Sequence, residues 1–191
     1  MATKAKVIVE VIPPKEIITG NPDAPVMLTE FGDYESEACA KANEIVKQLL
    51  EKFEGKLKFN FRHFPLTQVY QRSMKAAEAA VAASQEGKFW PMHNLLFAQR
   101  RNLGLTSLKV HSKEAGVTNK KFLEELMNST YGWHVRNDLL EGLDLGVRDV
   151  PTFFINGELF VGKPTLDNLS KGIEAALKAS KKKPAATKQR A

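Results

Sequence analysis

Hydrophobic and polar positions along the first third of the chain follow two different periods. Residues 26–31 (VMLTEF) form a mostly apolar run typical of a buried strand. Residues 57–64 (LKFNFRHF) alternate strictly, which predicts a second strand ending before Pro65. Between them, apolar residues recur every three or four positions over 38–53, and Ser36 is a good N-cap for the helix that this spacing predicts. The pattern therefore predicts a strand–helix–strand unit.

A long helical segment follows, and a hairpin closes the chain. We expect about four helices over 74–84, 89–99, 108–115 and 120–141. Residues 150–155 then predict a strand, Asn156-Gly157 a two-residue turn, and 158–161 the partner strand. A last helix is expected over 166–177, with Thr165 as its cap.

These elements predict an α/β protein with a mixed sheet, in which a helical insertion over about 67–147 separates the third strand from the C-terminal hairpin. Residues 1–14 are expected to hold a short strand over 6–12 and a linker, because Pro13 and Pro14 end the apolar run. Residues 15–177 form the predicted domain, and 178–191 a basic, disordered tail.

The net charge of +6 comes from the predicted tail rather than from the domain. Residues 178–191 carry six lysines and arginines and no acid, so the rest of the 191-residue chain is neutral. We interpret the tail as a solvated segment, and weak binding of nucleic acid or another anionic surface through it is the alternative. A basic face on the folded domain is not expected.

The cysteine count excludes two kinds of site. Cys39 is the one cysteine, which rules out an intramolecular disulfide and a cysteine-based zinc cluster. The four histidines lack metal-binding spacing, so no metal is expected. The apolar run over 7–12 is too short for a signal peptide, and no stretch approaches the roughly 20 apolar residues of a membrane helix. We therefore expect a cytoplasmic protein with no membrane span.

The candidate functional site lies where the first buried strand ends and the first long helix begins. In open α/β sheets, ligands bind beyond the carboxyl ends of the strands, and a helix N-terminus stabilises a thiolate. Residues 33–39 occupy this place, with Ser36 before the helix and Cys39 in its first turn.

Five segments in this order carry a resemblance to a known family. They are 30–35 (EFGDYE) before the S-x-x-C of 36–39, 61–66 (FRHFPL), 86–93 (EGKFWPMH), 150–157 (VPTFFING) and 159–162 (LFVG). Over about residues 15–177 the chain resembles the DsbA-like thioredoxin-fold family, in its soluble bacterial branch of thiol-disulfide oxidoreductases. The resemblance implies a thioredoxin-like fold and protein or peptide thiols and disulfides as partners.

The resemblance also implies roles for individual residues. The family carries C-x-x-C at this site, so Ser36 stands where the attacking cysteine belongs and Cys39 matches the second, more buried, resolving cysteine. Glu30 matches the buried acid beneath the pair. Pro151 matches the cis-proline beside the site, where it offers backbone groups to a bound chain together with Val150 and Thr152.

Replacement of the attacking cysteine limits the chemistry and leaves alternatives open. A serine hydroxyl cannot exchange disulfides, so we expect at most single-thiol redox activity through Cys39, with glutathione as a co-substrate and no resident cofactor. One alternative is glutathione binding through Ser36, as in the kappa-class transferases and isomerases. Another is a non-catalytic peptide-binding module. The sequence leaves open the oligomeric state and whether the serine is native.

Overall fold

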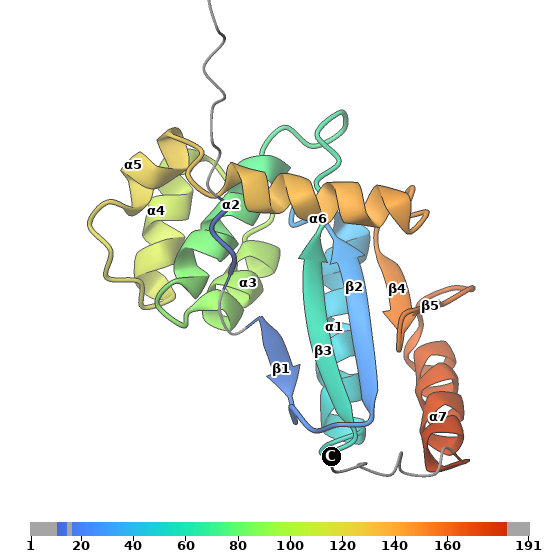
Figure 1. Ribbon diagram of the computed structural model, residues 1–191. Helices are drawn as coiled ribbons and strands as arrows, with labels where there is room; N and C mark the ends of the chain where they lie inside the picture. Colours follow the sequence, from blue (N-terminus) through green and yellow to red (C-terminus); the bar gives the residue numbers. More distant parts are fainter. Residues whose placement is uncertain (1–10, 15–16, 183–191) are drawn as a thin grey trace, which may run out of the picture.

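The computed structural model describes residues 11–14 and 17–182, and a five-stranded mixed sheet forms its centre (Figure 1). The strand order is β1-β3-β2-β4-β5. β2 and β3 are parallel, and the other neighbouring pairs are antiparallel. The strands are β1 (Ile18–Gly20), β2 (Val26–Gly32), β3 (Leu57–His63), β4 (Thr152–Ile155) and β5 (Glu158–Leu159).

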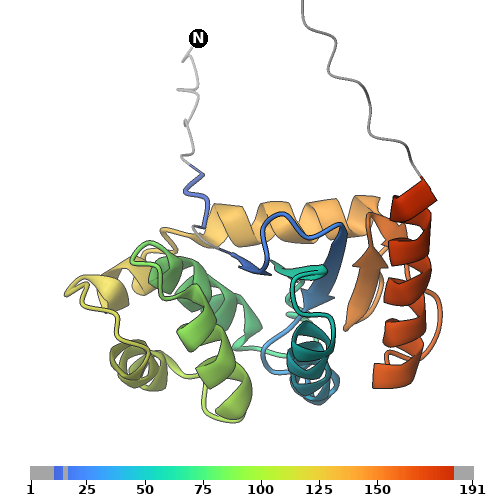
Figure 2. The same ribbon diagram turned by 90° about the horizontal axis from the view of Figure 1, so that it is seen from below.

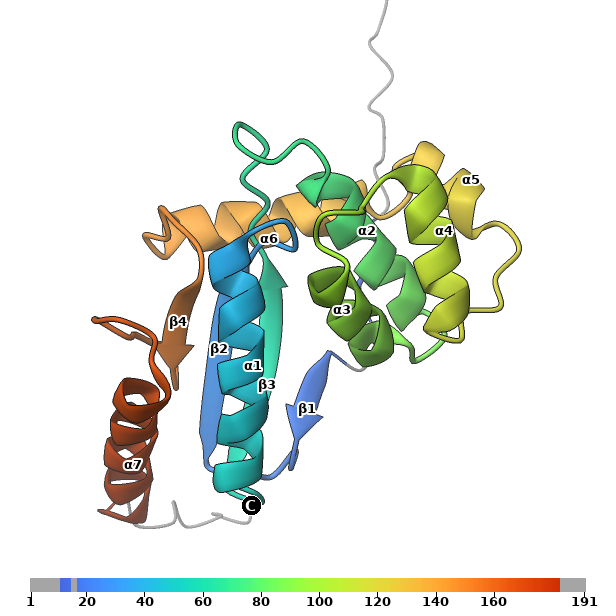
Figure 3. The same cartoon turned by 180° about the vertical axis from the view of Figure 1, so that it is seen from behind.

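Helices cover both faces of the sheet and one of its edges. They are α1 (Glu37–Lys52), α2 (Ser73–Ser84), α3 (Phe89–Ala98), α4 (Leu105–Glu114), α5 (Phe122–Met127), α6 (Gly132–Asp144) and α7 (Leu166–Lys182). α1 and α7 pack on one face, whereas α6 crosses the other face near the carboxyl ends of β2 and β3 (Figures 2 and 3). α2 to α5 gather beside the edge that carries β1 (Figure 1).

The close crossing of α6 over the sheet depends on a glycine. A Cβ atom on Gly142 would lie 2.7 Å from Cδ2 of Phe64 and 3.0 Å from Cδ1 of Phe31. Both rings are buried, so neither has room to move aside. Gly142 thus brings α6 against the end of the sheet from which the site loop emerges.

Most of the predicted elements are confirmed, including the thioredoxin-like layout with the helical insertion. The hairpin turn has the positive φ angles that Asn156 and Gly157 predict, +51° and +83°. Thr165 Oγ1 accepts a hydrogen bond from Asn168 N at 3.2 Å, as a capping residue does.

Several elements differ from the prediction, among them the hairpin strands β4 and β5, which span 152–155 and 158–159 where 150–155 and 158–161 were predicted. The expected helix over 120–141 is two helices, α5 and α6, because Ser129 takes a φ of +52° that no α-helix accommodates. The insertion therefore holds five helices rather than four. β1 was not expected, and α7 continues to Lys182, so the predicted disordered tail is helical over 178–182.

The predicted N-terminal strand falls mostly outside the described residues. Residues 6–10 and 183–191 lie there, whereas Val11 and Ile12 are described and belong to no strand. Within the described ranges, no helix is both long and apolar enough to cross a lipid bilayer.

Candidate functional site

Ser36 links the end of β2 to the start of α1. Its backbone is extended, at φ −69° and ψ 125°, and its Oγ accepts a hydrogen bond from Cys39 N at 3.3 Å. The predicted N-cap is therefore confirmed. The side chain is 3% exposed, so the hydroxyl lies just beneath the surface. Glu37 adds an acid to the first turn, where the helix dipole favours negative charge.

Cys39 lies in the first turn of α1 and is completely buried, at 0% exposure. Its Sγ accepts a hydrogen bond from Asp33 N at 3.4 Å. Burial raises the pKa of the thiol, and the nearby Glu30 carboxyl adds to the rise, while the contacts with Asp33 N and Ser36 oppose it. The sulfur is therefore a protonated thiol at neutral pH, and a thiol is a poor nucleophile.

Glu30 lies inside the sheet, at 1% exposure, on the strand that leads to the site. It is in register with Phe61 of β3 and Phe153 of β4, and its Oε1 has no hydrogen-bond partner. Burial raises the pKa of this carboxyl well above its ordinary value. Burial thus favours the protonated, neutral form of Glu30, in the place that the resemblance implies.

Asp33 organises the loop between β2 and α1, and the sequence analysis gave it no role. Its Oδ1 accepts hydrogen bonds from Glu35 N at 2.8 Å and from Ser73 Oγ at 2.7 Å, and its Oδ2 accepts one from Leu66 N at 2.8 Å. Burial raises the pKa of Asp33, although these hydrogen bonds oppose the rise. An acid directly after a buried strand was the available sequence signal.

Tyr34, the next loop residue, begins a second polar chain that the sequence analysis missed. Its hydroxyl lies 3.0 Å from Nδ1 of His93, and Nε2 of His93 lies 3.1 Å from Oδ1 of Asn43. Asn43 Nδ2 in turn donates to Asn94 Oδ1 at 3.2 Å. His93 belongs to the segment 86–93, which contributed to the resemblance without any assigned role.

The Pro151 loop lies beside the site because β4 pairs with β2. Phe31 is opposite Thr152 in that pairing, which places the start of β4 at the end of β2. The Val150–Pro151 peptide bond is cis. Val150 N donates to Oδ1 of Asp149 at 2.8 Å, and Thr152 Oγ1 donates to the Asp149 carbonyl at 2.7 Å.

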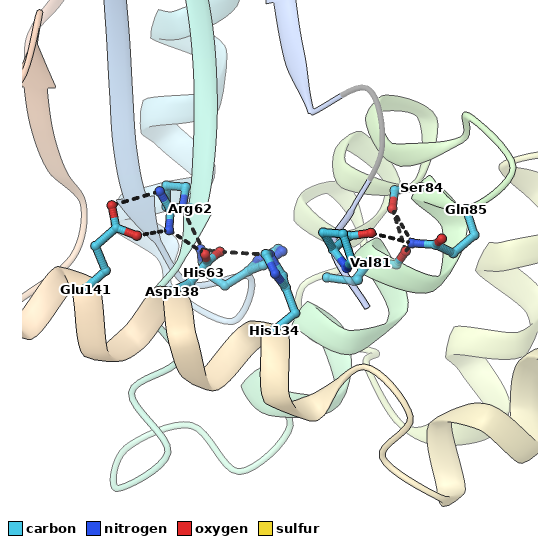
Figure 4. Close-up of polar contacts among 9 residues, drawn as sticks. Arg62, His63, Val81, Ser84, Gln85, His134, Asp138 and Glu141 are labelled. Carbon is cyan, nitrogen blue, oxygen red and sulfur yellow. Dashed lines mark hydrogen bonds and ion pairs between the residues drawn. The ribbon is translucent and has the colours of Figure 1, made fainter. Parts of the chain in front are cut away.

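A charged cluster fastens the end of β3 to α6 (Figure 4). Asp138 accepts from Arg62 Nε at 2.8 Å and from His63 N at 3.0 Å, and Nε2 of His134 lies 3.5 Å from its Oδ2. Glu141 pairs with the same guanidinium, with Nη1 donating to Oε1 at 3.1 Å. The cluster therefore supports the strand beside β2.

Two of these groups have strongly shifted pKa values. Burial alone would raise the pKa of Asp138, but the contact with His134 and the charges of His63 and Arg62 outweigh it and lower the value to about 2. Burial lowers the pKa of His63 to about 4. His63 is therefore neutral at pH 7, with an Nδ1 that lacks a hydrogen-bond partner.

The arrangement brings together the predicted residues Glu30, Ser36, Cys39 and Pro151 at the ends of β2 and β4. Within the described part of the chain, no three histidine, cysteine, aspartate or glutamate side chains form a group able to hold a metal ion. A hollow of about 560 Å³ between the β4–β5 hairpin and α7 is lined by none of Glu30, Ser36, Cys39 and Pro151. The site is thus a covered thiol next to a strand end.

Comparisons with known proteins agree on the fold. A thioredoxin family model matches residues 13–175. The crystal structure of BdbD from Bacillus subtilis superposes with a TM-score of 0.78 and 25% identity, over 87% of this chain and 96% of that one. The thiol-disulfide exchange protein alpha-DsbA2 from Wolbachia pipientis gives a TM-score of 0.72 and 26% identity, over 85% and 86% of the two chains.

A curated relative is a larger protein of another class. The Na(+)/H(+) antiporter NhaA 1 of Salinispora arenicola is 33% identical over 93% of this chain. The chain spans only 27% of that antiporter's length, so the similarity concerns one part of it.

Proposed function

Given that the chain belongs to the thioredoxin family, we propose that it is a DsbA-type thiol-disulfide oxidoreductase scaffold with an S-x-x-C site that binds polypeptide chains without dithiol exchange. The burial of the Cys39 sulfur behind Ser36 carries this proposal. Cys39 then has at most a single-thiol role.

Dithiol exchange needs two thiols with different tasks. One thiolate attacks a substrate disulfide, and the second thiol then attacks the mixed disulfide and releases the product. Ser36 holds the attacking position with an oxygen that cannot form a disulfide, and Cys39 is left without a second thiol in the chain. A mixed disulfide on Cys39 therefore needs an external thiol, such as glutathione, to release it.

The state of Cys39 makes even this reaction slow. Attack on a disulfide requires the thiolate, whereas burial holds the pKa of Cys39 above its ordinary value. The sulfur is also 0% exposed, so the loop over it has to move before a substrate makes contact. The raised pKa and the burial of Cys39 both predict slow single-thiol chemistry.

Polypeptide docking does not depend on the missing thiol. The backbone of Val150 and Pro151 lies at the edge of the site beside the end of β2, where its carbonyl groups would accept hydrogen bonds from an extended chain. The Val150 N–H is held by Asp149 and would have to be released before a bound chain could use it. Val150 is 8% exposed, and Pro151 and Thr152 are half-buried, so the loop is partly open to solvent. Proteins or peptides with thiols or disulfides are the partner class that the scaffold supports.

Intact mass after incubation with glutathione disulfide tests the redox part. We expect the native protein to stay unmodified over hours, and the protein in concentrated guanidinium chloride to gain one glutathione on Cys39. Rapid adduct formation on the native protein contradicts the proposal. Binding of a carbamidomethylated insulin B chain, measured by fluorescence anisotropy with Pro151→Ala as the comparison, tests the docking part: equal affinities contradict it.

Glutathione binding through Ser36 is the second candidate function. The Ser36 hydroxyl accepts from Cys39 N, which leaves its own proton to donate to a bound thiolate at the helix N-terminus. The 3% exposure of Ser36 argues against direct contact. Calorimetric titration with glutathione, using Ser36→Ala as the control, decides this: binding that Ser36→Ala abolishes favours the second candidate over the first.

A further inference from the structure

Three consecutive residues of the loop over Cys39 are tied to the helical insertion. Asp33 contacts Ser73, Tyr34 contacts His93, and Glu35 contacts the start of α2. We propose that Ser73 and His93 are positioning residues that keep this loop closed over the Cys39 sulfur, so that the thiol reacts only when their contacts open. The inference rests on the proposed single-thiol role of Cys39.

The first tie, a set of hydrogen bonds between the loop and the insertion, joins two loop carboxylates to the N-terminus of α2. This helix has no acid in its first turn, and its N-cap, Arg72, makes no side-chain capping bond. Ser73 Oγ donates to Asp33 Oδ1 at 2.7 Å, and Arg72 N donates to Glu35 Oε2 at 2.7 Å. The loop therefore supplies the negative charge that the helix start lacks, and the helix start holds the loop.

The second tie has a defined direction of hydrogen bonding. Asn43 Nδ2 donates to Asn94, so Asn43 Oδ1 is turned toward His93 as an acceptor. His93 Nε2 therefore carries the proton, and Nδ1 accepts from the Tyr34 hydroxyl. A neutral His93 imidazole can make both of its hydrogen bonds, to Tyr34 and to Asn43. This agrees with the burial that lowers the pKa of His93 well below its ordinary value.

Aromatic rings exclude water from this second tie. The centroid of the His93 ring lies 4.7 Å from that of Phe61, 5.0 Å from that of Phe97 and 5.8 Å from that of Phe89. Tyr34 and His93 are each 1% exposed. A hydrogen bond lost here is not replaced by one to solvent, so the contact holds the loop strongly.

These ties act on the sulfur only through the loop. Asp33 N donates to Cys39 Sγ, and Asp33 and Tyr34 are the residues that Ser73 and His93 fix. Ser73 and His93 lie 34 and 54 positions beyond Cys39 and have no hydrogen bond to its sulfur. Their substitution is thus expected to change access to Cys39 more than it changes the stability of the sheet.

Alkylation of Cys39 by iodoacetamide tests the proposal on the full native chain. The thiolate sulfur bonds to the acetamide carbon, iodide leaves, the thiol proton passes to buffer, and intact mass gives the rate. We expect Tyr34→Phe and Ser73→Ala each to raise the rate about tenfold, the change that a 1.4 kcal/mol weakening of closure gives. The double variant Tyr34→Phe/His93→Phe should react no faster than His93→Phe, because both remove one contact.

Ile173→Val is the matched control, since this buried residue lies on α7, away from the loop. Ile173→Val should lower the free energy of global unfolding by about as much as Tyr34→Phe and Ser73→Ala weaken loop closure. It should nevertheless leave the alkylation rate within about twofold of wild type. An equal rise in all variants means that Cys39 reacts only through global unfolding and overturns the proposal. No rise in Tyr34→Phe and Ser73→Ala overturns it as well.

Amide exchange of the unmodified protein gives a second measurement that no failed variant obscures. We expect the Asp33 amide, which donates to the sulfur, to exchange faster than the amides of Leu28 and Phe59 in the core strands. Identical exchange rates contradict a loop that opens by itself. Neither measurement involves peptide or glutathione binding, so a failure of the proposed function would be seen separately.

Discussion

The hydroxyl oxygen of Ser36 accepts a hydrogen bond from the backbone N–H of Cys39 at 3.3 Å. Ser36, which the proposed function places at the attacking position of a dithiol site, is thus engaged as the cap of α1. The N-terminus of the helix remains formed around a buried thiol, while the group that would attack a disulfide is missing. On the proposed function, the protein therefore lacks the attacking group and keeps the helix N-terminus around the thiol.

Removal of the cap should weaken the protein without touching redox chemistry. Ser36→Ala leaves Cys39 N without its side-chain acceptor, so we expect the free energy of unfolding to fall by about 1 kcal/mol. Ser36→Thr retains a hydroxyl and serves as the control, with a smaller loss. Urea titration followed by circular dichroism measures both. Equal losses would mean that the capping bond contributes nothing.

Glu30 should make the protein less stable as the pH rises. Its pKa in the folded state lies well above the ordinary 4.5, so the folded state binds more protons than the unfolded one over that window, and stability falls as pH increases. Between pH 4.5 and the raised pKa of folded Glu30, the free energy of unfolding of Glu30→Gln should rise relative to wild type by about 1.4 kcal/mol for each pH unit. Urea titrations at pH 4.5, 6 and 8 measure the difference, and parallel profiles contradict it.

His63 should act in the opposite direction. The unfolded chain takes up a proton near pH 6.5, whereas folded His63 stays neutral until about pH 4, so stability falls as the pH drops through this window. His63→Phe removes this titration and keeps an aromatic ring beside Tyr34 and Phe89. As the pH falls from 6.5 to 4, we expect the free energy of unfolding of the variant to rise by about 3 kcal/mol relative to that of wild type. A pH-independent difference in thermal or urea unfolding would exclude this role for His63.

Asp149 should compete with a bound chain at the Pro151 loop. Its carboxylate holds the N–H of Val150 at 2.8 Å, a group that a docked backbone would use. Asp149→Ala frees this donor, so binding of carbamidomethylated insulin B chain should tighten about fivefold. Asp149→Asn keeps an acceptor oxygen and should bind as wild type does. Weaker binding by Asp149→Ala would show that the carboxylate supports docking instead.

The sequence was sufficient for elements whose own residues decide their structure. The patterns over 26–31 and 57–64 predicted β2 and β3 to within one residue because their periods fit a buried and a half-buried strand. The three residues of β1 carry too short a pattern and depend on pairing with Asn60 and its neighbours. The break between α5 and α6 rests on the positive φ of Ser129, a residue without a strong turn signal.

The residues of the candidate site likewise divide into those that local sequence could place and those that depend on long-range packing. Ser36 and Cys39 could be placed from local pattern, whereas the depth of Glu30 was implied only by the resemblance. The contacts of Asp33 with Ser73 and of Tyr34 with His93 join positions 40 and 59 residues apart. They depend on how the insertion packs against the loop, and neither period nor capping pattern contains that information.

Restoring the missing thiol tests the central claim most directly. If the scaffold lacks only the attacking group, Ser36→Cys should lose two hydrogens on mild oxidation, regain them with dithiothreitol, and catalyse insulin reduction. Wild type should do neither, and Ser36→Cys/Cys39→Ala should form no internal disulfide. A folded Ser36→Cys variant that stays fully reduced and inactive, or a wild-type protein that already catalyses the reaction, would contradict the account.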